Sequence, residues 1–142
     1  MLPEEIIMKM ESPDFIKICQ LNKTFHKLCN NQHFWHKMYN KYYGDSGMKQ
    51  LLTNIEYDEL FKICYNLHFI QITFVDGISL TDLYNSHDIS ISGDVNLKFL
   101  TALGYMHHLE EINFSISDFT KVIYIPRIIN DLPLLKKITY QK

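Results

Sequence analysis

Three short stretches of this chain repeat one spacing of apolar and aromatic residues. In each, an isoleucine follows an apolar residue by three positions, and an aromatic residue follows the isoleucine by two. The stretches are "FIQITF" at 69–74, "LEEINF" at 109–114 and "LKKITY" at 135–140. Such alternation over a short run predicts a strand with one buried face. The fold therefore has to bring several similar strands to one core.

Each of these strands is preceded by a stretch of helical character. The helical stretches are residues 57–67, 96–108 and 120–133, and "DISISG" at 88–93 is a fourth, weaker strand candidate. A single helix and strand cannot bury their own apolar faces, so neighbouring units must stack into a continuous core. The sequence therefore predicts an α/β array of helix–strand units.

The isoleucines of the four candidate strands define equivalent positions: Ile72, Ile89, Ile112 and Ile138. Their separations lie near the roughly 20 to 29 residues of leucine-rich repeats, which the units resemble. The fullest match to that pattern runs from Leu109 to Phe119, with Ser117 where the family prefers Asn or Cys. We expect a short, irregular, leucine-rich-repeat-like solenoid over residues 48–142.

The first 44 residues are typical of helices instead. Pro3 suits the first turn of a helix, and Ser12 is a natural N-cap for a second helix, with a bend near Asn22 and Lys23. A third helix is expected to carry five aromatic or apolar residues. They are Phe34, Trp35, Met38, Tyr39 and Tyr42. The loop "YGDSG" at 43–47 then marks the boundary between the two parts.

This N-terminal part, residues 1–44, resembles an F-box. The matching residues, in order, are Leu2-Pro3, Glu5-Ile6-Ile7, Phe15 with Ile18, Leu21 with Lys23, Phe25-x-x-Leu28 and Phe34-Trp35. The link "MKMES" at 8–12 is shorter than usual, and Phe25 stands where Trp is more frequent. Leucine-rich repeats often follow an F-box, so the two resemblances support each other.

The resemblance implies docking on the adaptor Skp1 within a cullin-based ubiquitin ligase, while the second part holds a protein substrate. Some 40 residues in three short helices also bury too little surface to be robust alone. Ten residues are expected to divide between an internal core and the Skp1-facing surface. They are Leu2, Pro3, Ile6, Ile7, Phe15, Ile18, Leu21, Phe25, Leu28 and Trp35. Two alternatives stay open: a decoy or scaffold that binds Skp1 without a substrate, and an ordinary helical core.

The resemblance to leucine-rich repeats implies that outward strand positions form the substrate-binding face. These are Thr73, Ser90, Asn113, Ser115, Lys137 and Thr139. Small polar residues suit the recognition of a protein segment, and equally a plain solvated surface. The last strand has an open edge that could recruit a partner strand or pair with itself.

We do not expect this chain to catalyse a reaction. His26, Cys29, His33 and His36 share one face of a continuous helix, but they span about 15 Å, too far to surround one metal ion. The acids and bases near residues 107–111 lack a positioned catalytic partner. We therefore predict no catalytic residue, metal or cofactor, and a small metal-dependent enzyme is the remaining alternative.

Composition limits partners and location. A net charge of −2 gives no field that would attract nucleic acid or an anionic membrane. The acidic start "MLPEEII" and the lack of a long apolar run predict a cytoplasmic or nuclear protein. Cys19, Cys29 and Cys64 are expected as reduced, buried thiols. One alanine and one arginine in the whole chain suggest AT-rich coding DNA, as in large DNA viruses or protists.

Overall fold

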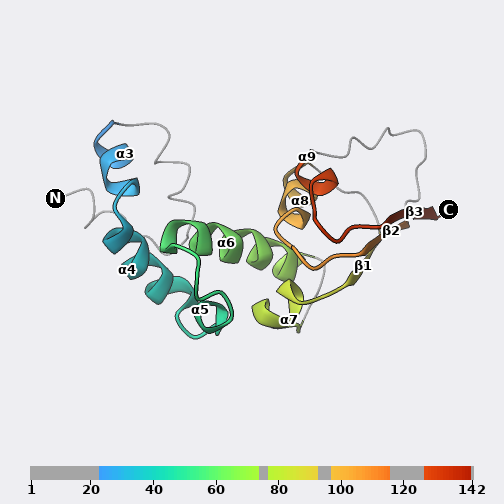
Figure 1. Ribbon diagram of the computed structural model, residues 1–142, viewed down its shortest axis with the longest axis horizontal. Coiled ribbons are helices and arrows are strands. Elements are labelled where there is room, and N and C mark those ends of the chain that lie inside the picture. Colours follow the sequence, from blue (N-terminus) through green and yellow to red (C-terminus); the bar gives the residue numbers. More distant parts are fainter. Residues whose placement is uncertain (1–22, 74–76, 93–96, 116–126, 142) are drawn as a thin grey trace. The chain divides into compact units, whose positions relative to one another are not determined.

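The computed structural model describes residues 23–73, 77–92, 97–115 and 127–141 (Figure 1). Within these ranges the chain forms seven helices and three strands. It divides into two compact units, residues 1–65 and 66–142. The division falls inside a long helix, downstream of the loop at 43–47 where the sequence placed it. None of the described helices has the length and apolarity to cross a membrane.

The described part of the first unit is helical. It contains α3 (Lys23–Cys29), α4 (Gln32–Tyr43), α5 (Met48–Leu51) and the start of α6 (Tyr57–Thr73). The Asn31 side chain accepts a hydrogen bond from the backbone N–H of His33 at 2.9 Å and so caps the start of α4. The predicted third helix is confirmed. The two helices predicted upstream of it fall mostly outside the described residues.

Aromatic packing holds this unit together. The ring centroid of Phe61 on α6 lies 5.3 Å from that of Trp35 and 5.2 Å from that of Tyr43, both on α4. Tyr39 lies over Tyr57 at 5.8 Å. Because α6 supplies these partners, the first unit extends beyond the helices that the sequence assigned to it. The described core comprises Phe34, Trp35, Met38, Tyr39, Tyr43, Met48, Leu60, Phe61, Ile63 and Cys64.

The strand predicted at residues 69–74 is wrong, because α6 continues through Thr73. Its buried residues Leu60, Cys64, Leu67 and Ile70 recur at helical spacing, so burial of this one face favours the helix over a β-like local pattern. Ile72, expected in the sheet core, is instead 68% exposed on the helix. The spacing of apolar residues did not distinguish the two structures here.

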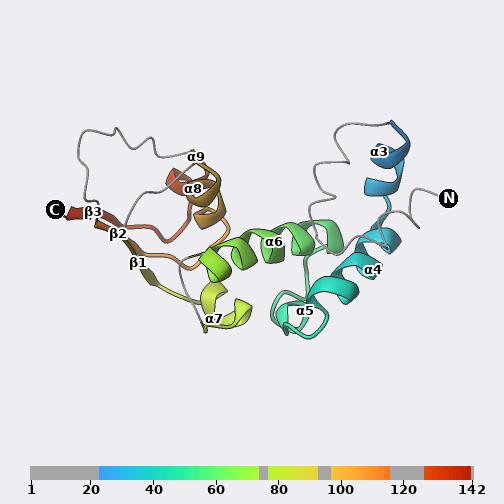
Figure 2. The same ribbon diagram turned by 180° about the vertical axis from the view of Figure 1, so that it is seen from behind.

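The second unit alternates short helices with parallel strands. After the end of α6, the described elements are α7 (Leu80–Tyr84), β1 (Asp88–Ser92), α8 (Leu97–Leu103), β2 (Glu111–Ser115), α9 (Arg127–Asn130) and β3 (Lys137–Gln141). The strands form one sheet in the order β1-β2-β3, and both pairings are parallel (Figures 1 and 2). The weaker strand candidate at 88–93 is therefore a real strand.

The register of the sheet confirms three of the four equivalent isoleucines. Ile89 pairs with Ile112, and Ile112 pairs with Ile138. Each isoleucine also follows the same turn, because the residue three positions before it donates its N–H to a carbonyl three residues further back. These donor–acceptor pairs are Ser86–Leu83, Leu109–Met106 and Leu135–Leu132, at 3.2, 3.1 and 3.4 Å. The three strands are thus each preceded by the same type of turn, at the same distance from the isoleucine.

Helices α8 and α9 pack against each other beside this sheet. A Cβ on Gly104, just after α8, would lie 2.5 Å from Cγ1 of Ile128 on α9. Only a glycine allows so close an approach. The expected α/β class is thus confirmed at a coarse level: the described chain mixes helices and strands and contains a small parallel sheet.

Candidate functional site

The outer face of the sheet gathers most of the residues predicted to bind a substrate. Side chains alternate along each strand, and in β1 Ile89 and Ile91 are buried while Asp88, Ser90 and Ser92 are exposed. In-register pairing then places Ser90, Asn113 and Thr139 in one row across the three strands. We call the outward residues of the strands the polar face. They are Asp88, Ser90, Ser92, Glu111, Asn113, Ser115, Lys137 and Thr139.

The structure places two of the remaining predicted face residues on strands and one on a helix. Ser115 is exposed and pairs with Ser92 of β1, and Lys137 pairs with Glu111 of β2. Thr73 is the last residue of α6, so its assignment to a strand is wrong. The sequence missed Asp88, Ser92 and Glu111, although the same two-residue alternation from Ser90 and Asn113 would have found them.

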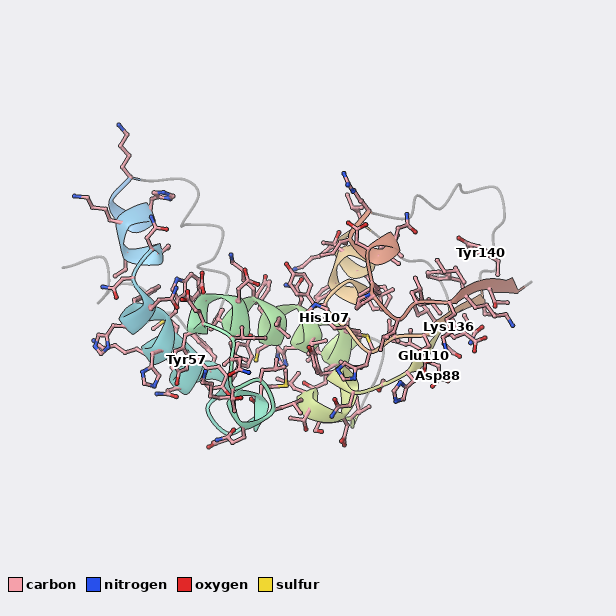
Figure 3. The ribbon with its side chains drawn as sticks, in the orientation of Figure 1. Tyr57, Asp88, His107, Glu110, Lys136 and Tyr140 are labelled. Carbon is pink, nitrogen blue, oxygen red and sulfur yellow. The ribbon has the colours of Figure 1, made fainter. Side chains whose placement is uncertain are left out.

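A charged cluster lies where the three strands begin (Figure 3). Lys136 Nζ donates a hydrogen bond to Glu110 Oε1 at 2.9 Å, and His87 Nδ1 lies 3.2 Å from Glu110 Oε2. The backbone joins the same residues, since Glu110 N donates to His87 O at 2.6 Å and Lys136 N donates to Glu110 O at 2.8 Å. His87, Glu110 and Lys136 therefore form one further row across the sheet, directly before the polar face.

Electrostatics favour the charged form of Glu110. The hydrogen bond from Lys136 and then its charge lower the pKa of Glu110, desolvation opposes them, and the charge of His87 contributes the smallest lowering effect. The second row of charges is looser, because Lys137 Nζ lies 3.8 Å from Glu111 Oε1. No described residue pairs with the exposed Asp88 in an ion pair. Three carboxylates, those of Asp88, Glu110 and Glu111, thus lie at the start of the strands.

Tyr84 and two histidines form a second polar group beside the strands. The Tyr84 hydroxyl lies 3.0 Å from His107 Nδ1, and its ring centroid lies 5.1 Å from that of His108. Burial raises the pKa of Tyr84. His107 also lines an open pocket of about 350 Å³ together with Tyr105, Ile128 and Leu132. Residues 107–111 are half-buried or buried here.

The predicted Skp1-binding residues fall largely outside the described part. Leu2, Pro3, Ile6, Ile7, Phe15, Ile18 and Leu21 lie in residues 1–22. Phe25 lies in α3, and Leu28 lies there too and is half-buried. The described residues therefore include only the last three of the ten, Phe25, Leu28 and Trp35.

Trp35 belongs to the internal core of the first unit. Its side chain is 3% exposed, and its Nε1 donates a hydrogen bond to the Cys29 carbonyl at 2.6 Å. Its ring packs edge-on against Phe34 at 5.5 Å. Tyr42 is only half-buried, whereas Tyr43, which the sequence assigned to the loop, is buried.

The structure tests the predictions made for two of the cysteines and for the histidines spaced like metal ligands. Cys64 is a free, buried thiol, and burial raises its pKa to about 12. Cys29 is half-buried and disulfide-bonded, so the prediction of a reduced, buried thiol is wrong there. α3 ends at Cys29, and α4 begins at Gln32, so the continuous helix assumed for His26, His33 and His36 is broken. Across the described ranges, no three His, Cys, Asp or Glu side chains are placed to hold a metal ion.

Comparison with known proteins gives no match to a family model, to a curated protein or to a solved structure. The resemblance to an F-box and to leucine-rich repeats therefore rests on the residues quoted above.

Replacing Trp35 tests its role in the core. We expect Trp35→Ala to lower the free energy of unfolding by about 3–5 kcal/mol, as for other buried aromatic truncations. Trp35→Phe keeps most of the packing but leaves the Cys29 carbonyl without its donor, at a cost of about 1–3 kcal/mol. Denaturant unfolding measures both. Asn40→Ala, exposed on the same helix, is the control, and an unchanged stability of Trp35→Ala would contradict this placement.

Replacing Lys136 tests the charged cluster. A carboxyl whose pKa is lower in the folded state stabilises the fold above its unfolded pKa, and this contribution is lost as the pH falls through the folded pKa. Lys136→Gln should therefore raise the pKa of Glu110 and reduce the loss of stability on acidification. Carboxyl-carbon NMR titration measures the pKa directly. Lys137→Gln, whose lysine faces Glu111 instead, should leave Glu110 unchanged; equal effects of the two variants would refute the pairing.

Proposed function

We propose that this protein is a substrate-receptor subunit of a Skp1-cullin ubiquitin ligase. Its N-terminal helices would bind the Skp1-type adaptor, and through it a cullin, while the polar face would bind a protein target. It needs no catalytic group of its own, because the transfer of ubiquitin belongs to other subunits. The observation that carries the proposal is the row of Ser90, Asn113 and Thr139 across three parallel strands in register.

The polar face supports protein binding because it departs from the usual parallel sheet. Parallel sheets are normally covered by apolar contacts on both faces. Here the buried face carries isoleucine and phenylalanine, while the other carries small polar and charged groups. The small side chains of Ser90 and Asn113 leave room for a peptide backbone and offer donors and acceptors to it, whereas the Thr139 hydroxyl is buried. Such a face fits an extended or flat protein surface better than a small molecule.

The helical unit supports the adaptor side of the proposal. The closing pair of the F-box pattern, Phe34 and Trp35, is buried where helix α4 meets α6. Since Trp35 serves the internal core, the docking surface would come from the other residues of the motif. Leu28 of α3, which is half-buried, is one of them. Ile6 is another, chosen from the resemblance alone.

Binding to a purified Skp1-type adaptor tests this proposal. We expect the immobilised chain to retain the adaptor, and Ile6→Asp to weaken retention by about tenfold or more, as for a buried apolar contact in an interface. Ile6→Val is the matched control and should bind like the parent chain. Asn113→Arg, in the centre of the polar face, should also bind the adaptor normally.

Three results would separate the alternatives. Loss of ubiquitination of a bound target in the Asn113→Arg variant supports a receptor. Adaptor binding without any target in reconstituted reactions supports a decoy or scaffold. No adaptor binding by the parent chain, or full binding by Ile6→Asp, contradicts the proposal in both forms.

A further inference from the structure

The outer edge of β3 exposes backbone groups that the sheet does not use. Lys137 N donates to Glu110 O at 3.1 Å, which directs the peptide groups of Lys137 toward β2. Because these directions alternate along a strand, Thr139 also turns toward β2, while Ile138 and Tyr140 turn their N–H and C=O groups outward. Among the described residues, β3 pairs only with β2. Within residues 77–92, 97–115 and 127–141, nothing pairs with the outward backbone groups of these two residues.

The apolar face of β3 is also less covered than that of its neighbours. Along the row of isoleucines, Ile89 is 7% exposed and Ile112 is fully buried, whereas Ile138 is half-buried. In the next row, Phe114 is 1% exposed, but Tyr140, stacked on it at 5.6 Å, is 49% exposed. Figure 3 shows Tyr140 at the far end of β3 from Lys136. The side chains of Ile138 and Tyr140 thus leave apolar surface exposed at this edge.

We propose that two copies of this chain pair through β3, antiparallel and about a two-fold axis at Thr139. Thr139 is the middle residue of the strand, so this register alone pairs all five strand residues. Ile138 of each copy then faces Tyr140 of the other, and both turn their backbone groups to the shared edge. This gives two hydrogen-bonded pairs and an aromatic–β-branched contact on the apolar face.

The side chains of β3 suit pairing with a second copy. Lys137 faces Gln141 across the axis, so no two lysines lie directly opposite each other. Thr139 then lies opposite Thr139 of the other copy, and its hydroxyl oxygen is already buried within one copy. The pattern of the strand is therefore compatible with itself.

The opposite edge of the sheet lacks this driving force. In β1, Ile89 and Ile91 are only 7% and 2% exposed, so pairing there would bury little further apolar surface. Asp88, Ser90 and Ser92, which alternate with them, are exposed and polar. The dimer interface thus belongs to β3, independent of whether the chain binds an adaptor.

Two measurements on the full chain test the pairing. Sedimentation velocity over a range of concentrations should show a shift from monomer to twice the monomer mass. Thr139→Cys should form a reducible, disulfide-linked dimer in mild oxidant, because directly opposite residues in an antiparallel pair have the Cα spacing that a disulfide requires. Ser90→Cys, at the matching row of β1, should give no more linked dimer than the parent chain.

The dimer should also be sensitive to charge at the axis. Thr139→Lys places two like charges directly opposite each other and should shift the monomer–dimer transition to higher concentration, while circular dichroism checks that the variant is folded. A parent chain that stays monomeric at all concentrations would overturn the proposal. So would equal cross-linking through residues 139 and 90.

Discussion

The alignment of three isoleucines across a parallel sheet is the constraint on which the second unit depends. Ile112 lies between Ile89 and Ile138 and is fully buried. A slip of one residue would turn every buried side chain of a strand to the outer face. The common turn before each isoleucine prevents this, because it places the first residue of each strand at the same height. The polar face and the open edge of β3 both follow from that register.

The charged row before the strands extends the same alignment. His87, Glu110 and Lys136 are joined by backbone hydrogen bonds as well as by their side chains. Exposed ion pairs contribute little to stability by themselves. Their position is more informative, because it sets the Glu110 carboxylate next to the charged row of Asp88, Glu111 and Lys137 at the start of the strands. The exposed ring of Tyr140 belongs to the other, apolar face of the same sheet, where it stacks on Phe114.

The sequence predicted the fold well where burial alternates cleanly and poorly where it does not. Ile89 belonged to the weakest candidate strand, yet it lies in register with Ile112. Ile72 belonged to a stronger candidate but is exposed on α6, because the helical face made by Leu60, Cys64, Leu67 and Ile70 is the one that is buried. Helix α7 was missed, although Ser79 caps it by accepting from Asp82 N, a signal present in the sequence. The resemblance to leucine-rich repeats chose the outward positions; those on β1, β2 and β3 lie on strands, whereas Thr73 lies on α6. Their role as a substrate-binding face stays a prediction. The role of Trp35 was left open by the sequence, since its partner Phe61 lies on a different helix.

The most direct test of this account is methyl NMR of the isoleucines in the folded chain. Adjacent strands lie about 4.8 Å apart, so paired side chains on one face give strong through-space contacts. The account predicts cross-peaks from Ile112 to both Ile89 and Ile138, and none from these three to Ile72. Absence of either cross-peak, or a contact between Ile72 and Ile89, would contradict it.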